Sequence, residues 1–213
     1  MQKLLVITGP TASGKTGLSI ALARQFKGEI ICADSRTIYK GMDIGTAKVT
    51  EEEMNGIPHY GLDMIDPSQK YSVGDFKEFA DTKIREIAGR GKLPMLVGGT
   101  GLYISAVVEN YGFDGENGEP QYSALMLAPK VDREVVYERI NQRVDLMVQD
   151  GLFGEVGELL KKYSVEDPGM TGIGYKEIVP AVLGTVSKEA AIEHLKRDSR
   201  RYAKRQITWW RHH

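Results

Sequence analysis

The stretch "GPTASGKT", residues Gly9 to Thr16, decides the fold of this chain. It fits the pattern G-x-x-x-x-G-K-[ST] of a phosphate-cradling P-loop. The apolar run "KLLVIT" precedes it and has the length of a buried parallel strand. The stretch "TGLSIALARQF" follows it and has the pattern of a helix. Strand, loop and helix in this order predict a polyphosphate site, without saying whose phosphate it holds.

The residue types in the loop explain why it suits an anion. Gly9 and Gly14 let the backbone curl so that its N–H groups point inward, and the helix that follows turns its positive end toward the phosphates. Lys15 adds a point charge, and the hydroxyl of Thr16 suits a Mg²⁺ ion. The predicted phosphate-binding residues are Gly9, Pro10, Thr11, Ala12, Ser13, Gly14, Lys15 and Thr16.

Length and composition exclude several classes of protein. A chain of 213 residues is long enough for one large domain with a real core. Its one cysteine, Cys32, excludes an internal disulfide and a multi-cysteine zinc site. There is no signal peptide before the loop, and no apolar run approaches the ~20 residues needed to span a bilayer. We therefore expect a cytoplasmic protein, a monomer, with no membrane partner.

Strand and helix patterns alternate along the chain. The strand signals are "KLLVIT", "EIICAD", "LPMLVGG" and "SALMLAP", and the helix signals cover residues 15–26, 74–89, 101–109, 132–149, 153–162, 174–183 and 187–206. This alternation predicts an α/β fold of the P-loop NTPase-like type, a parallel sheet with helices on both faces. We expect one domain over residues 1–213, with a Gly-rich surface connection at 109–123 and a helical part at 132–213.

Two polar residues follow predicted strands at the edge where the P-loop should lie. Asp34 closes "EIICAD", and Thr100 follows "LPMLVGG". In open α/β sheets ligands bind beyond the carboxyl ends of the strands, so we expect both to face the same crevice as Lys15. The alternative is that Asp34 only caps a turn and that "VGGTGLY" is only a strand-to-helix turn. The later strands end in Gly-Thr and Pro rather than in a Walker B aspartate, which argues against routine ATP hydrolysis.

Positive charge is concentrated at the C-terminal end. From Lys196 to His213 there are seven Lys or Arg and one Asp, a local charge of +6, so the other 195 residues carry −7 of the total of −1. These basic residues recur at steps of three and four, which predicts one helical stripe, and Tyr202, Trp209 and Trp210 interleave with them. Basic and aromatic side chains together suit unpaired RNA. The alternative is a solvated helix face with the tryptophans in the core.

Several motifs taken together resemble one family. They are "GPTASGKT", "ADSRTIYKGMDIGTAK", "GIPHYGLDMIDPSQKYSVGDF", "LVGGTGLY", "RINQRVDLMVQDGLFGEV", "GIGYKE" and "YAKRQITWWR". They occur in the order found in the tRNA dimethylallyltransferases, which modify the adenosine 3′ of the anticodon in tRNA. The resemblance covers most of the chain, and no other P-loop family known to us combines "DIGTAK" with "AKRQ-T-W".

The resemblance implies a donor, a metal and a set of roles. The P-loop would hold the diphosphate of dimethylallyl diphosphate with Mg²⁺, bound in part by Thr16, rather than ATP. Asp34 matches the family's general base, Thr100 a hydroxyl in the same site, and Arg133 a charge for the departing diphosphate. The positions that match residues around the tRNA are Ser35, Arg36, Thr37, Gly174, Tyr175, Lys204, Arg205, Gln206, Trp209 and Arg211.

One departure from the family pattern keeps other functions open. Typical bacterial members insert a helical subdomain of about 100 residues, the size of a normal domain, where this chain has only a short connection. That subdomain helps to hold the anticodon stem-loop, so its absence puts tRNA affinity in doubt. The alternatives are an adenylate isopentenyltransferase that uses free AMP, ADP or ATP, and a small-molecule P-loop kinase. The basic C-terminal helix favours tRNA, because a free nucleotide needs no such surface.

Overall fold

A five-stranded parallel sheet forms the centre of the computed structural model, which describes residues 1–113 and 117–212. The strands are β1 (Gln2–Thr8), β2 (Gly28–Ala33), β3 (His59–Tyr60), β4 (Leu93–Gly98) and β5 (Tyr122–Leu127). Their order is β3-β2-β4-β1-β5, and every pair is parallel. The predicted fold class is confirmed. The sequence did not predict β3, because two residues are too few to show a period.

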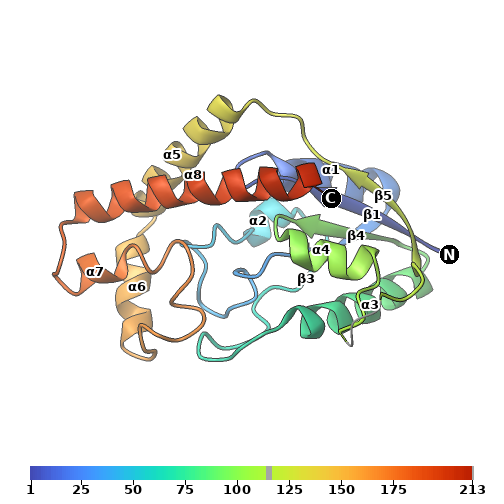
Figure 1. Cartoon of the computed structure of the whole chain (residues 1–213), viewed down its shortest axis with the longest axis horizontal. Coiled ribbons are helices and arrows are strands. Elements are labelled where there is room, and N and C mark those ends of the chain that lie inside the picture. Colours follow the sequence, from blue (N-terminus) through green and yellow to red (C-terminus); the bar gives the residue numbers. More distant parts are fainter. Residues whose placement is uncertain (114–116, 213) are drawn as a thin grey trace.

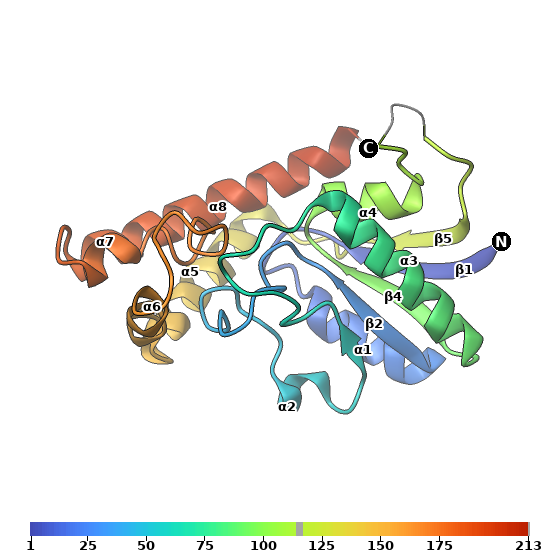
Figure 2. The same ribbon diagram turned by 90° about the horizontal axis from the view of Figure 1, so that it is seen from below.

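Helices cover both faces of the sheet (Figure 2). Leu5 and Ile7 of β1 pack toward α1 (Lys15–Phe26), which contributes the buried Ala23. Leu4 and Val6 point the other way, toward α3 (Val73–Gly89) and α4 (Gly101–Val108). Successive strand residues face opposite sides, so an apolar run without alternation is what a sheet covered on both faces requires.

The last third of the chain is largely helical. It contains α5 (Arg133–Gln149), α6 (Leu152–Leu160), α7 (Val179–Val182) and α8 (Lys188–His212). A second core lies there, in which Leu152, Val156 and Tyr175 pack against Ile38 and Met42 from the loop after β2. Helix α8 runs along the molecule from the α6–α7 end to the sheet (Figure 1). The helical part is thereby tied to the loop that begins at the end of β2.

Two helix predictions differ from the structure. The helix expected at 174–183 is only the short α7, and turns precede it. Gly174 has a φ of +104° and donates its N–H to the Glu177 carboxylate, so the backbone there is bent rather than helical. Helix α8 continues to His212, beyond the predicted end at 206, because the Trp210 side chain packs against the core of the sheet. The sequence also missed α2 (Glu51–Met54), a single turn with a capping box.

The expected surface connection at 109–123 joins α4 to β5, and its residues 114–116 lie outside the described part of the chain. No helix in the described ranges has both the length and the apolar character that a bilayer crossing requires.

Candidate active site at the carboxyl edge of the sheet

Three strands end side by side at one edge of the sheet. Gly98 at the end of β4 pairs with Thr8 of β1 on one side and with Ala33 of β2 on the other. The residues that follow these strands are Gly9, Asp34 and Gly99, so the P-loop, the candidate base and the glycine-rich turn are brought together. A side chain at position 98 would collide with the Ala33 carbonyl, and only glycine allows this close approach.

The P-loop has the backbone shape that an anion cradle needs. Gly9, Ala12 and Gly14 all have positive φ angles, of 140°, 62° and 89°. The Lys15 ammonium folds back and donates to the Pro10 carbonyl at 2.7 Å. Burial lowers the pKa of Lys15 from 10.5 to about 8, although the Asp34 carboxylate opposes this shift. A desolvated ammonium gains from an anionic ligand, so the loop is suited to a polyphosphate.

Arg143 lies beside the loop; it falls within the motif "RINQRVDLMVQDGLFGEV", but the sequence analysis did not single it out. This residue of α5 donates from Nη1 to the Thr11 hydroxyl at 3.2 Å. Burial lowers its pKa, and its charge in turn helps to lower the pKa of Lys15. The contact spans 132 residues of chain, so residue spacing did not predict the pairing with Thr11. Arg143 is therefore a second cation at the phosphate site.

Arg133, the arginine chosen from the sequence, lies in a different setting. It occupies the first turn of α5, is exposed, and holds its guanidinium over the Tyr137 ring at 5.8 Å from the centroid. This cation–π contact is within one helix and does not require a ligand. A role for Arg133 at the diphosphate stays a prediction.

Asp34 and Thr100 lie next to each other across two strand ends. The Asp34 Oδ1 atom accepts from the Arg36 backbone N–H at 2.8 Å, so the turn-capping interpretation holds for one carboxylate oxygen. The Thr100 hydroxyl oxygen accepts from the Ser35 N–H at 3.1 Å. Asp34 also acts electrostatically on Lys15, so the carboxylate and the ammonium lie near each other at this edge of the sheet. A carboxylate and a buried ammonium therefore lie close together at the ends of these strands.

Tyr202 of α8 reaches into the same place. Its side chain lies close to Thr100, and burial together with the Asp34 carboxylate raises the pKa of its phenol to about 12. The sequence had assigned this tyrosine only to a basic and aromatic helix surface. Tyr202 lies four residues before Gln206 on an amphipathic helix. This spacing places both side chains on the inward face of the helix.

Two buried tyrosines lie near Asp34. Tyr39 and Tyr103 are 4% and 5% exposed. The pKa of Tyr103 is raised by burial first, and then by Tyr71, Tyr39 and Asp34. Phe76 stacks on the Tyr103 ring with centroids 4.2 Å apart. Buried aromatic rings therefore lie close to the Asp34 carboxylate.

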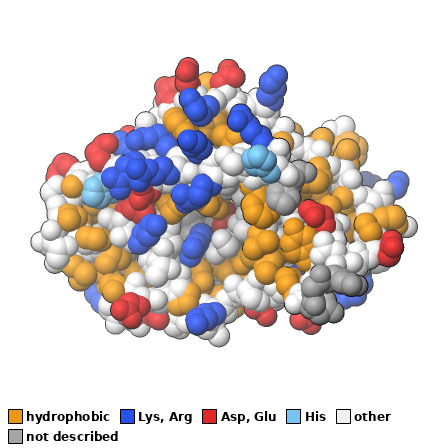
Figure 3. Space-filling view, viewed as in Figure 1, with side chains coloured by type: hydrophobic (Ala, Val, Ile, Leu, Met, Phe, Trp, Pro, Cys, Tyr) orange, Lys and Arg blue, Asp and Glu red, His pale blue; other side chains and the backbone are white. Residues whose placement is uncertain are grey.

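The basic stripe of α8 is on the surface. Arg197, Arg201, Lys204 and Arg205 are exposed on one face of the helix, and Figure 3 shows Lys and Arg side chains gathered where α8 crosses this view of the molecule. Arg197 and Arg201 share Asp198, at 3.0 and 3.3 Å. Arg200 turns inward and bonds Asn141 of α5. The exposed charge available to a polyanion is therefore greatest toward the C-terminal half of the helix.

Other residues matched to the tRNA surface make internal contacts. Tyr175 is 1% exposed, and its hydroxyl donates to Glu155 at 2.7 Å. Thr37 is 8% exposed, and Trp209 lies against Gly101. Arg36 is half-buried and donates to the Pro168 carbonyl at 3.1 Å. Contact of these residues with tRNA stays a prediction.

Gly174 and Glu155 hold the loop that follows Asp34. A side chain at Gly174 would collide with the carbonyl of Gly45. Glu155 of α6 accepts from the backbone N–H groups of Asp43, Ile44 and Gly45 at 2.9, 2.8 and 3.0 Å. The motifs "DIGTAK" and "GIGYKE" therefore contact each other. Glu155 supports the same loop, and the sequence analysis did not single it out.

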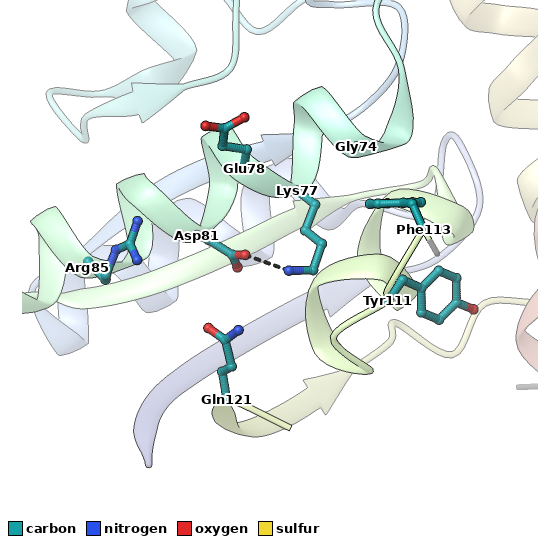
Figure 4. A pocket seen from close by; sticks show the side chains of 8 residues that line it. All are labelled: Gly74, Lys77, Glu78, Asp81, Arg85, Tyr111, Phe113 and Gln121. Atoms are coloured by element: carbon teal, nitrogen blue, oxygen red, sulfur yellow. Dashed lines mark hydrogen bonds and ion pairs between the residues drawn. The ribbon is translucent and has the colours of Figure 1, made fainter. Parts of the chain in front are cut away.

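A cavity of about 470 Å³ lies away from this crevice, between α3 and the connection before β5. Figure 4 shows its lining residues, with Lys77 and Asp81 paired at 2.9 Å. Asp81 also accepts from the Tyr122 hydroxyl at 2.6 Å. Lys77 and Asp81 satisfy each other, and we assign no chemistry to this cavity. Within residues 1–113 and 117–212 there is no cluster of three His, Cys, Asp or Glu that would hold a metal unaided.

Comparison with known proteins agrees with this geometry. The profile of the family described as "IPP transferase" matches residues 37–121 and 113–213, and that of "Isopentenyl transferase" matches residues 2–66. The tRNA dimethylallyltransferase of Bacillus subtilis is 40% identical over 276 residues, covering 99% of this chain and 88% of the relative. This chain belongs to the tRNA dimethylallyltransferase family.

Solved structures of relatives share the fold. The tRNA isopentenylpyrophosphate transferase of Staphylococcus epidermidis is 38% identical, with a TM-score of 0.92, over 99% of this chain and 90% of that one. A eukaryotic dimethylallyltransferase acting on tRNA is 27% identical, with a TM-score of 0.89, over 98% of this chain and 70% of that one. The tRNA dimethylallyltransferase fold is therefore retained here.

The comparisons also locate the shortened segment. The alignment with the Bacillus subtilis relative spans 276 positions, and this chain has 213 residues, so at least 63 positions have no counterpart here. The two matches to the family profile overlap at residues 113–121, within the predicted connection 109–123. The missing residues therefore belong between α4 and β5.

Proposed function

We propose that this tRNA dimethylallyltransferase transfers the dimethylallyl group from dimethylallyl diphosphate to N6 of the adenosine 3′ of the anticodon in tRNA. The observation that carries the proposal is the meeting of Lys15, Asp34 and Thr100 at one edge of the sheet, beside aromatic rings. A phosphate cradle, a proton acceptor and an apolar wall are the three parts that this reaction needs. The absence of a Walker B carboxylate fits a reaction that cleaves no γ-phosphate.

Asp34 serves as the general base in this proposal. N6 of adenine attacks the allylic carbon C1, the C1–O bond to the diphosphate breaks, and the diphosphate leaves with the electron pair. The N6 proton passes to the Asp34 carboxylate as the C–N bond forms. Arg36 N–H and Thr100 fix that carboxylate and its surroundings. The adenine must leave its stack to reach the crevice, as for other enzymes that act on bases.

The donor would lie along the P-loop. Loop N–H groups, Lys15 and Arg143 would gather the negative charge of the leaving diphosphate. Thr16 is exposed at the start of α1 and can offer its hydroxyl to a Mg²⁺ ion that the diphosphate carries. These residues fit such an ion, because Mg²⁺ at phosphates takes only one or two protein ligands. When bound, Mg²⁺ supplies charge neutralisation to the leaving group.

The tRNA would lie over α8 and the helical part at 132–213. Exposed Lys204, Arg205 and Arg211 support a phosphate-backbone contact there. Because the segment between α4 and β5 is shortened, we expect weaker tRNA binding than in longer relatives. We expect the protein to act as a monomer in the cytoplasm.

One assay tests the proposal. The protein is incubated with labelled dimethylallyl diphosphate, Mg²⁺, and either bulk tRNA or AMP, and the acceptor that takes the label is identified. We expect label in tRNA and none in AMP. Label in AMP alone would replace the proposal with an adenylate isopentenyltransferase, and ATP-dependent phosphorylation of a small acceptor without any prenyl transfer would favour a kinase.

A further inference from the structure

The inner face of α8 contacts the loops on both sides of the reacting atoms. Tyr202 reaches Thr100, Gln206 reaches the P-loop and Gly99, and Trp209 covers Gly101. These residues are spaced by four and three positions, so they share one helix face. Lys204 and Arg205 lie on the exposed face.

Gln206 makes the tightest of these contacts. It is 6% exposed, and its Oε1 accepts from the Thr11 N–H at 2.8 Å while its Nε2 donates to the Gly99 carbonyl at 2.8 Å. The orientation of the amide is unambiguous, because one partner can only donate and the other can only accept. A side chain at Gly99 would collide with this amide. Gln206 is therefore a fitted bridge between two loops far apart in sequence.

We propose that Gln206 is a positioning residue that sets the distance between the donor-binding P-loop and the turn carrying Thr100, and that it does not bind tRNA. This inference rests on the function proposed above. The P-loop holds the diphosphate, and the Gly99–Thr100 turn lies against Asp34, which receives the proton. An in-line transfer needs the reacting atoms about 3–3.5 Å apart, and a displacement of about 1 Å can cost about 10²-fold in rate. An amide bonded to both loops resists such a displacement.

The chemistry of the amide explains why glutamine stands here. A carboxylate would keep the bond to the Thr11 N–H but would face the Gly99 carbonyl with a lone pair. It would also place a negative charge beside the diphosphate. An apolar side chain of the same length would make neither bond and would leave the Thr11 N–H without its partner. Glutamine alone has both a donor and an acceptor at this reach.

The test compares Gln206→Met and Gln206→Glu in the full chain with wild type. The matched control is Gln25→Met, at an exposed glutamine near the C-terminal end of α1. Four quantities are measured: wild-type transfer to tRNA, affinity for inorganic diphosphate with Mg²⁺, tRNA affinity against salt, and the single-turnover rate at saturating substrates. Thermal unfolding is followed for every variant.

We expect Gln206→Met to slow the saturated single-turnover rate by about 10²-fold, the cost of a small misplacement. Its tRNA affinity and salt slope should stay within twofold of wild type. Gln206→Glu should slow the same step and should also weaken diphosphate binding at least tenfold. Gln25→Met should change none of these quantities.

Some results would overturn the inference. Loss of tRNA affinity in Gln206→Met, with an unchanged rate at saturating tRNA, would make Gln206 an RNA contact. If Gln206→Met does not fold, Gln206→Glu decides, and an unchanged rate and diphosphate affinity in that variant would refute the bridge. Absence of transfer in the wild type would instead refute the proposed function. The diphosphate affinity of the Gln206 variants would still test whether Gln206 positions the P-loop.

Discussion

Asp34 combines a local and a chemical role at the scale of single residues. One carboxylate oxygen accepts from the Arg36 backbone N–H and holds the turn, and within the described residues the other has no hydrogen bond to the protein. The residue is half-buried beside Lys15 and Tyr202. A carboxylate held through one oxygen keeps the second for a substrate proton.

Replacing Asp34 tests its role as base. Asp34→Asn keeps the shape and an acceptor for the Arg36 N–H, so we expect donor binding to persist while turnover falls by about 10²–10⁴-fold, the usual contribution of a positioned base. Single-turnover rates and diphosphate affinity are measured together. Lys15→Ala is the contrast, because it should weaken diphosphate binding as well. Near-full turnover in Asp34→Asn would mean that another group takes the proton.

The lowered pKa of Lys15 predicts how donor binding depends on pH. Because burial lowers this pKa to about 8, the free enzyme loses the ammonium charge as the pH rises through that value. A bound diphosphate favours the charged form, so binding above pH 8 takes up a proton. Affinity for dimethylallyl diphosphate should therefore fall above pH 8, by up to about tenfold per pH unit.

Titration calorimetry between pH 7 and 10 measures this dependence. Lys15→Arg is the control, since a guanidinium stays protonated over the range and should flatten the profile. An equally steep fall in Lys15→Arg would assign the titration to another group.

At the scale of elements, the proposed function gives the two faces of helix α8 different roles. Its inner face carries Tyr202 and Gln206 to the catalytic loops, while its outer face carries the basic stripe. A phosphate contact gives sequence-independent affinity that falls with salt. In the proposed function, helix α8 therefore contributes both to tRNA binding and to the positioning of the catalytic loops.

Neutralising two residues of the outer face tests this division. Lys204→Ala with Arg205→Ala should weaken tRNA binding and reduce the log–log salt slope by about one unit per lost contact. The saturated single-turnover rate should barely change, because the inner face is untouched. Arg24 and Lys27, exposed near the opposite edge of the sheet, give a matched double-alanine control. An unchanged salt slope with a collapsed rate would mean that this face serves the active site.

At the scale of the whole molecule, we expect a donor bound at the carboxyl edge of the sheet to stabilise the entire fold. Ligand that binds only the native state stabilises it by about 2.7 kcal/mol at about 100 times its Kd. For a chain of this size, about 2–4 °C in Tm corresponds to each kcal/mol. Dimethylallyl diphosphate with Mg²⁺ should raise Tm more than ATP does at the same concentration. Equal stabilisation by ATP, together with its hydrolysis, would favour the kinase alternative.

The sequence by itself determined the elements whose cause is local. The P-loop, the alternation of strands and helices, and the position of Asp34 after a strand follow from spacing within a few residues, and the structure confirms their arrangement. The basic stripe could also be predicted from the sequence, because helical spacing is a local property. The wrong helix at 174–183 shows the limit, since a bend at Gly174 is fixed by its packing against Gly45.

Only the tertiary structure decided which side chains support the site. Arg143, Gln206 and Glu155 contact loops that lie 132, 195 and about 110 residues away in the chain. Each sits in a helix where its residue type is ordinary, and its role arises from a hydrogen bond that no periodicity encodes. Surface charge and the turns at strand ends depend on residues that are close together along the chain. A bridge across the active site is a property of neighbours in space, which exist only once the sheet and α8 have packed together.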